Sequence, residues 1–202
     1  MRLVVSGTDT GIGKTVLAAA IAMATGSAYW KPIQAGLDDE TDSERVAALG
    51  VRALPEAYRL SAPCSPHWAA EMDGIRIEDA ELALPPGEDR LVVEGAGGVL
   101  VPIRDDLSFA DLFARWNLPV VLAARTALGT INHTLLSIEA LRARGVPIHG
   151  VAFIGEAVEN TEATIARVGQ VKRLGRLPML PEVTADALLA AFGAAFDPDD
   201  FV

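Results

Sequence analysis

Cysteine and basic residues are scarce in this sequence of 202 residues. The single cysteine, Cys64, excludes an internal disulfide framework and fits a reducing compartment. Lysine and arginine together number 17, against 27 aspartates and glutamates, which gives a formal net charge of -10. Such a chain repels nucleic acids and anionic membrane surfaces, because binding to them rests on many contacts between basic residues and phosphates. We therefore expect no nucleic acid and no membrane among its partners.

Segments typical of export or membrane insertion are also missing. The chain begins MRLVVSG and shows no apolar stretch followed by a small-residue cleavage site. Its longest uncharged stretch, residues 15–30, is shorter than the roughly 18–20 apolar residues of a membrane span. No internal repeat or Pro/Gly/Ser-rich linker divides the chain. We expect one cytoplasmic domain over residues 1–202.

Short apolar runs alternate with longer segments of helical pattern. The runs are continuous, which is typical of strands buried on both faces of a sheet. We expect strands at residues 2–6, 28–31, 91–94, 119–124 and 148–154, and helices at 14–25, 43–49, 108–116, 132–144, 159–169 and 184–191. Ser43 and Ser108 stand where helix N-caps are expected. The alternation predicts an α/β fold: one three-layer α/β/α domain with a mostly parallel sheet and helices on both faces.

In such folds, ligands bind outside the carboxyl ends of the strands. The first loop there, GTDTGIGKT at residues 7–15, follows a strand and opens a helix, as a phosphate-binding loop does. Its backbone N–H groups can cradle phosphates, Lys14 can bridge the β- and γ-phosphates, and Thr15 can ligate Mg²⁺. The usual pattern has glycine where this chain has Thr8. The alternative is a glycine-rich turn capped by Thr10, but lysine at a helix N-terminus opposes the helix dipole and favours the nucleotide site.

Two acidic residues lie in suitable positions to hold Mg²⁺. Glu94 ends an apolar run and is followed by a glycine-rich turn, and Asp42 lies in an acidic stretch just before a predicted helix. Each has a structural alternative: Glu94 could pair with Lys31 or cap the next turn, and Asp42 could be a helix cap.

Lys31 closes the second predicted strand, before Pro32. A lysine there is costly to bury unless it meets an anion, so we favour contact with an anionic substrate over a lysine that snorkels at the edge of the core. Cys64 is paired with no base in the sequence, and we expect no role for it.

Six motifs occur in one order along nearly the whole chain. They are GTDTGIGKT at residues 7–15, KPIQAG at 31–36, PCSPHWAA at 63–70, VEGAGG at 93–98, LGTINHTLLSIEALRARG at 128–145 and LGRLPMLPE at 174–182. Together they resemble the dethiobiotin synthetase family, whose fold is of the P-loop NTPase type.

The resemblance implies an ATP- and Mg²⁺-dependent ligase that closes a cyclic urea in biotin biosynthesis. In that family CO₂, supplied as such or as bicarbonate, adds to an amine of 7,8-diaminononanoate to give a carbamate. The carbamate attacks the γ-phosphate of ATP, and the neighbouring amine then displaces phosphate from the mixed anhydride. Dethiobiotin, ADP and phosphate result. Carbamate and triphosphate are both anions, so the site needs dense local positive charge and exclusion of water.

The resemblance also assigns roles to residues of this chain. Catalysis would fall to Lys14 and Lys31, and the metal to Thr15, Asp42 and Glu94. The nucleotide would be bound by these three residues with Thr10, Gly11, Ile12, Gly13, Lys14, Gly155, Pro178 and Leu180. Substrate would be bound by Lys31, Ala35, Gly95, Ala96 and Gly97, and by Thr130 and Asn132 of a partner subunit, because the family is homodimeric.

The chain departs from the family at several places, one of which is Gly11, where some members carry an acidic residue. Ala35 stands where many members have serine, so one hydroxyl near the reacting groups is missing. Many members read adenine with an asparagine at the end of the strand at 148–154, where this chain has Gly155, so we expect Gly155 and the segment 177–180 to read the base through backbone contacts.

The competing interpretation is a nucleotide-switch ATPase of the partitioning or septum-site type without ligase activity. Those proteins carry a second lysine early in the loop, where this chain has Asp9.

Overall fold

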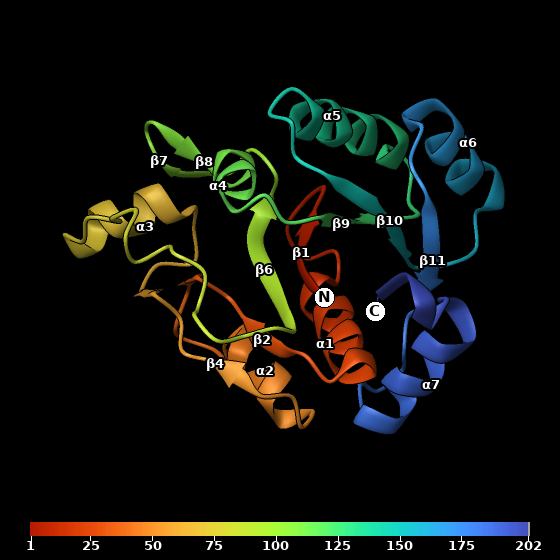
Figure 1. Cartoon of the computed structure of the whole chain (residues 1–202), viewed down its shortest axis with the longest axis horizontal. Coiled ribbons are helices and arrows are strands. Elements are labelled where there is room, and N and C mark those ends of the chain that lie inside the picture. Colours follow the sequence, from red (N-terminus) through yellow and green to blue (C-terminus); the bar gives the residue numbers. More distant parts are fainter. Residues whose placement is uncertain (202) are drawn as a thin grey trace.

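The computed structural model describes residues 1–201, and within them seven strands form one parallel sheet (Figure 1). The first strand, β1, lies in its middle, so the N-terminal strands extend the sheet to one side and the C-terminal strands to the other. In spatial order the strands are β11 (Arg173–Leu177), β10 (Ile148–Ile154), β9 (Val120–Arg125), β1 (Arg2–Gly7), β6 (Leu91–Gly98), β2 (Ala28–Trp30) and β4 (Ala53–Leu54).

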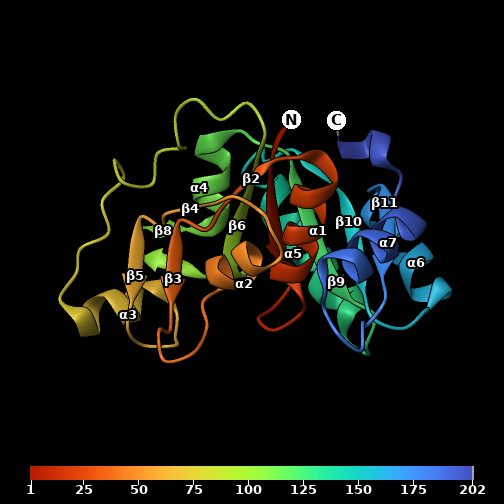
Figure 2. The ribbon, with the colours of Figure 1, turned by 90° about the horizontal axis from the view of Figure 1, so that it is seen from below.

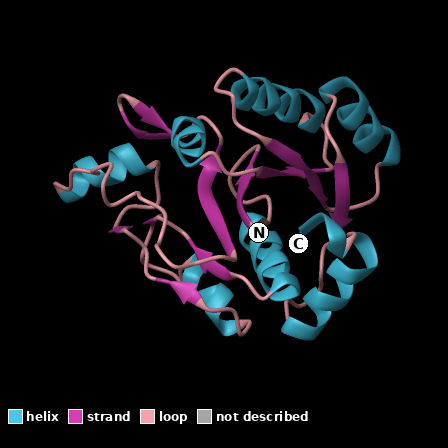
Figure 3. Ribbon diagram, in the orientation of Figure 1, coloured by secondary structure: helices cyan, strands magenta, loops and turns pink. Residues whose placement is uncertain are grey.

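Helices cover both faces of this sheet (Figures 1 and 3). One face carries α1 (Lys14–Thr25), α2 (Asp42–Ala48) and α7 (Ala185–Ala195), and the other carries α4 (Phe109–Trp116), α5 (Thr130–Arg142) and α6 (Glu159–Gly169). Side chains alternate along the strands, so Val4 packs in the core under α4–α6 while Leu3 and Val5 pack in the core under α1 and α7. The predicted three-layer α/β/α fold is confirmed.

Smaller elements extend beyond the sheet on the side of β2 and β4 (Figure 2). They are the parallel pair β3 (Ile33–Ala35) and β5 (Tyr58–Leu60), helix α3 (Pro66–Asp73), and the antiparallel pair β7 (Pro102–Arg104) and β8 (Leu107–Ser108). A 3₁₀ turn at Pro198–Phe201 lies apart from them, where Phe201 packs against Phe192 of α7. No helix within residues 1–201 is long and apolar enough to cross a membrane.

The observed helix boundaries can be compared with the predicted ones and with the predicted N-caps. Helices α1 and α6 match the predicted ranges 14–25 and 159–169, and Ser108 caps α4 as expected. Ser43 is not a cap. Thr41 caps α2 instead, because its hydroxyl accepts from the Glu44 backbone N–H while the Glu44 carboxylate accepts from the Thr41 N–H in a capping box.

The structure also contains one strand that the sequence did not indicate, and it lacks one turn that was expected. Edge strand β11 was not predicted, because its sequence RLGRL carries two arginines and a glycine. The glycines after Glu94 do not form a turn but continue β6 to Gly98.

The close approach of β11 to α7 makes Gly175 a test of this packing. A Cβ at Gly175 would overlap the Ala195 carbonyl oxygen and lie 2.6 Å from Phe196 Cδ1. We expect Gly175→Ala to lower the free energy of unfolding by about 1–3 kcal/mol. Gly193→Ala is the matched control: it lies in α7 with open space around it, and should raise stability by about 0.5–1 kcal/mol. Urea unfolding measures both, and equal effects would contradict the packing argument.

Candidate active site

The loop between β1 and α1 has the geometry of an anion cradle. Gly11 and Gly13 adopt positive φ of 68° and 93°, and Gly13 is the N-cap of α1 with no side chain capping it. Thr10 is therefore not the cap, and the first N–H groups of α1 face the loop without a side-chain acceptor.

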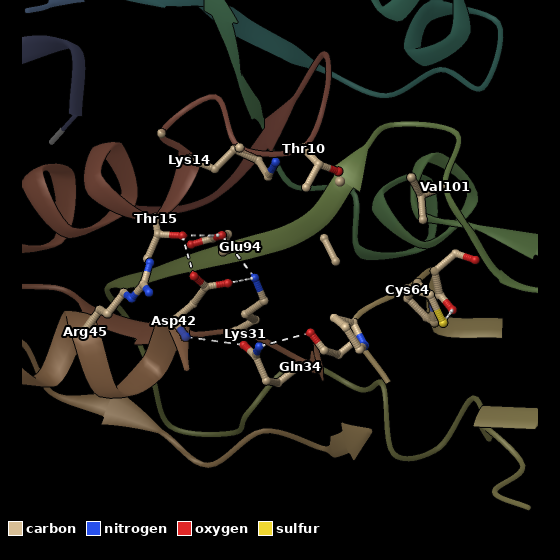
Figure 4. A pocket seen from close by; sticks show the side chains of 18 of the residues that line it. Thr10, Lys14, Thr15, Lys31, Gln34, Asp42, Arg45, Cys64, Glu94 and Val101 are labelled. Carbon is tan, nitrogen blue, oxygen red and sulfur yellow. Dashed lines mark hydrogen bonds and ion pairs between the residues drawn. The ribbon is translucent and has the colours of Figure 1, made fainter. Parts of the chain in front are cut away.

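Lys14 reaches back over this loop (Figure 4). Its ammonium donates to the backbone carbonyl of Asp9 at 2.7 Å, and burial lowers its pKa. The carboxylate of Asp9 pairs with Arg125 at the end of β9, with 3.0 Å between Oδ2 and Nη2. Asp9 thus holds the loop in place twice, through its backbone carbonyl and through its side-chain carboxylate.

Three oxygen-bearing side chains converge beside the loop (Figure 4). The Thr15 hydroxyl lies 2.9 Å from Asp42 Oδ1 and 3.0 Å from Glu94 Oε1, and can donate its proton to either. Asp42 is the first residue of α2 and its carboxylate points to Thr15, so the cap interpretation of Asp42 is wrong. The structure brings together the three residues predicted to hold a metal.

Lys31 lies between the two carboxylates. Its ammonium pairs with Asp42 Oδ2 and with Glu94 Oε1, the latter at 3.2 Å, so the ion pair considered as an alternative role for Glu94 is present as well. Burial alone would lower the pKa of Lys31, but Glu94 and Asp42 outweigh it and raise that pKa. Burial would likewise raise the pKa of Asp42, but Lys31 and Thr15 outweigh it and lower it. Lys31 and Asp42 are therefore charged at neutral pH.

The donor set fits magnesium. Hydroxyl and carboxylate oxygens are hard ligands, and Mg²⁺ in phosphate-transfer sites is held by one or two carboxylates together with phosphates and water. Within the described part of the chain, no group of three or more His, Cys, Asp or Glu side chains could hold a metal by itself. Thr15, Asp42 and Glu94 would therefore form a partial site that a nucleotide completes.

A cavity of about 660 Å³ opens in front of these groups. It runs from the phosphate-binding loop across Lys31 to the segment before α3 (Figure 4). The predicted residues that line it are Thr10, Gly11, Gly13, Lys14, Thr15, Lys31, Ala35, Asp42, Glu94, Ala96 and Gly97.

Other predicted residues lie outside this lining. The Ile12 side chain is buried, and a Cβ at Gly95 would lie 2.8 Å from Phe113 in α4, so Gly95 packs toward that helix. Thr130 and Asn132 lie at the start of α5, where Thr130 is buried and Asn132 is exposed.

The residues predicted to read the base gather at the ends of β10 and β11. The N–H of Gly155 donates to the Leu177 carbonyl at 3.0 Å, just before Pro178, and Leu180 packs against the core under α1. The Gly155 carbonyl accepts a hydrogen bond from Arg176 Nη1. Arg176 in turn forms an ion pair with buried Glu162, with 3.1 Å between Nε and Oε1. Ile154 lies 3.2 Å from where a Cβ of Gly13 would be, so this corner adjoins the phosphate-binding loop.

Sequence reasoning missed three residues of the site. The Tyr29 hydroxyl donates to Glu94 Oε2 at 2.8 Å, and burial together with Glu94 raises the pKa of Tyr29 well above its usual value. Gln34 lines the cavity and accepts from the Asp42 N–H at 3.4 Å, and Cys64 also lines the cavity. Tyr29 lies in a short apolar strand and looks like a core residue, and Gln34 lies in the KPIQAG motif, which by itself gave it no role.

The buried position of Lys31 between two acids gives a stability prediction. Lys31→Met leaves both carboxylates without their cation, so the free energy of unfolding should fall by about 3 kcal/mol in the absence of Mg²⁺. Millimolar Mg²⁺ should restore part of this loss. Lys172→Met is the control: Lys172 pairs with Asp200, but its own side chain is 57% exposed, so the cost should stay below about 1 kcal/mol. Urea unfolding with and without Mg²⁺ checks both, and equal losses would contradict the electrostatic argument.

Comparisons with known proteins agree with this geometry. A family model described as an AAA domain matches residues 1–187. The chain is 62% identical over 201 residues to a protein of Sphingopyxis alaskensis, with 99% of this chain and 98% of the relative covered. It is 61% identical over 204 residues to a protein of Rhodopseudomonas palustris, with 99% and 96% covered. Both relatives are named ATP-dependent dethiobiotin synthetase BioD.

A solved structure shares the fold. The cell division ATPase MinD of Pyrococcus furiosus superimposes with a TM-score of 0.59 over 98% of this chain and 97% of its own. Its sequence is only 13% identical, so the likeness concerns the P-loop NTPase fold alone.

Proposed function

Because this chain belongs to the ATP-dependent dethiobiotin synthetase family, we propose that it is an ATP-dependent ligase of biotin biosynthesis that closes a cyclic urea. Its substrates would be 7,8-diaminononanoate, CO₂ and ATP, and its products dethiobiotin, ADP and phosphate. Residues 1–202 would act as one catalytic domain in the cytoplasm. The observation that carries the proposal is the convergence on one cavity of Lys14, Lys31 and the side-chain oxygens of Thr15, Asp42 and Glu94.

The phosphate-binding loop would receive the triphosphate. Backbone N–H groups of residues 10–15 would contact its oxygens, and the Lys14 ammonium would exchange the Asp9 carbonyl for the β- and γ-phosphates. Thr15, Asp42 and Glu94 would hold Mg²⁺, which when bound neutralises phosphate charge. Gly155, Pro178 and Leu180 would contact the base through their backbone and apolar surface.

Lys31 would meet the carbamate. An ammonium has three N–H donors, and Asp42 and Glu94 take two of them in the described structure, which leaves one for an anion in the cavity. A carbamate held there would lie on the same side as the γ-phosphate, because Lys14 and Lys31 line the same cavity. The carbamate oxygen forms the bond to phosphorus and ADP departs.

Ring closure would follow in the same cavity. The second amine attacks the carbonyl carbon, and phosphate departs with the bonding electrons of the anhydride. Ala96 and Gly97 expose backbone on the substrate side of the cavity, and Ala35 adds an apolar contact in place of a hydroxyl. Water would have to be kept from the anhydride during this step, because it would otherwise hydrolyse it.

The central prediction is a coupled reaction. Purified protein should release ADP only when diamine and bicarbonate are both present, and Lys31→Ala should lower this rate at least 100-fold, since it removes the cation that holds the carbamate. A coupled ADP assay measures both. Arg45→Ala, which alters another residue lining the cavity, should retain activity within about fivefold. Brisk ATP hydrolysis that ignores the diamine would instead support the nucleotide switch.

The structure gives that switch little support. The residue at the position of the switch lysine is Asp9, and its carboxylate is already paired within the chain to Arg125.

A homodimer would complete the substrate site. A second cavity, of about 540 Å³, lies between residues 8–10, residues 98–102 and α5, and it shares Thr10 and Val101 with the first. Leu100 and Leu136 at this cavity are 52% and 55% exposed. A second copy of the chain that covers these leucines would bring the start of its own α5, with Thr130 and Asn132, toward the substrate carboxylate.

Leu136→Glu tests this interface. A charge placed in an apolar contact should shift the protein from dimer to monomer and lower ligase activity at least tenfold, because the partner no longer completes the site. Light scattering coupled to gel filtration gives the mass. Leu189→Glu, on α7 at the opposite face, is the control and should stay dimeric. A native chain that is monomeric and fully active would rule out the shared site.

A further inference from the structure

The two oxygens of Glu94 face different surroundings. Oε1 contacts Thr15 at 3.0 Å and Lys31 at 3.2 Å, on the side of the cavity. Oε2 accepts the hydroxyl of Tyr29 at 2.8 Å. Glu94 is only 1% exposed, so each of its contacts is made away from bulk water.

Tyr29 approaches Glu94 from behind the site. It lies on β2, which pairs with β6 in the register Tyr29 to Val92, and its ring packs in the core on the α1 side of the sheet. Its side chain is fully buried and does not line the cavity, so it touches neither nucleotide nor substrate there.

A phenylalanine would satisfy the packing at this position without burying a hydroxyl. Burying a hydroxyl costs free energy unless it finds a partner, and this one finds a single carboxylate oxygen. The hydrogen bond fixes the plane of that carboxylate and occupies Oε2, which leaves Oε1 directed at Thr15 and the cavity.

We propose that Tyr29 is a positioning residue that orients Glu94 for the magnesium ion of the nucleotide complex. The inference rests on the proposed role of Glu94 as a metal ligand. Without the hydroxyl, Oε2 has no donor and the carboxylate can rotate, so that Lys31 or Thr15 can engage either oxygen. Groups that orient metal ligands commonly change metal affinity 10–100-fold when they are removed.

Tyr29→Phe tests the proposal in the full-length protein. The readout is binding of a fluorescent ATP analogue, titrated with Mg²⁺ and also measured without it. We expect the Mg²⁺ concentration for half-maximal enhancement of binding to rise about tenfold, while metal-free binding changes by less than about twofold. A second arm places Tyr29→Phe in a Glu94→Gln background, where removal of the hydroxyl should add no further loss.

The chain offers a matched control. Its other tyrosine, Tyr58, accepts from the Glu78 N–H at 2.8 Å in the segment beyond the sheet, and Tyr58→Phe should leave the Mg²⁺ titration unchanged. The urea unfolding midpoints of both tyrosine variants are measured before the titration. If Tyr29→Phe is too unstable to titrate, it is studied in the Gly193→Ala background, which is expected to be more stable.

The outcomes separate this inference from the proposed function. A native protein whose nucleotide binding ignores Mg²⁺ would overturn the metal role of Glu94 and, with it, the inference. A native Mg²⁺ response that Tyr29→Phe leaves intact would overturn the inference alone. An equal loss of binding with and without Mg²⁺ would show a structural role for Tyr29 and would also overturn it.

Discussion

The site depends on one buried contact, the ammonium of Lys31 between Asp42 and Glu94. The three residues come from the end of β2, the start of α2 and the middle of β6. The contact therefore joins elements that lie far apart in the sequence. Removal of the lysine would leave two neighbouring carboxylates without their cation, and removal of the carboxylates would leave a buried ammonium without its anions, and both changes are strongly unfavourable. The contact therefore fixes the oxygens that face Thr15 even before any ligand binds.

This local arrangement resolves the conflict between an acidic chain and an anionic ligand. The chain repels anions at a distance, with a net charge of -10, yet two of its three lysines line one cavity. Backbone N–H groups at the start of α1 add partial positive charge, which a net charge calculated from charged side chains does not include. In the proposed roles, the acidic residues near the cavity would contribute as well, since they would hold the metal that accompanies a nucleotide.

Much of this site could be predicted from sequence, because its main parts are encoded locally. A glycine-rich loop before a helix, a lysine after one strand and a glutamate in another each carry their own signal, and parallel strands bring their carboxyl ends to one edge. Tyr29 and Gln34 could not be found in this way. The register of β2 with β6 brings Tyr29 to Glu94, and the start of α2 brings the Asp42 N–H to Gln34. The cap of α2 was misplaced because Thr41 and Ser43 are both good N-caps, and only the reciprocal contact with Glu44 decides between them. Strand β11 escaped because edge strands tolerate arginine and glycine.

β1 is the middle strand of the sheet, and the strands on its two sides contribute different residues to the site. Every charged side chain that lines the main cavity belongs to residues 14–94, on or beside β1, β6 and β2. On the other side of β1, Gly155 follows the end of β10 and Leu177 ends β11, and these two residues belong to the corner proposed to meet the base through backbone and apolar surface. With the proposed roles, chemistry and nucleotide choice would be carried by separate stretches of the chain. Substitutions around β10 and β11 would then alter which nucleotide is accepted while the reacting groups stay in place, and nucleotide use could diverge without loss of the reaction.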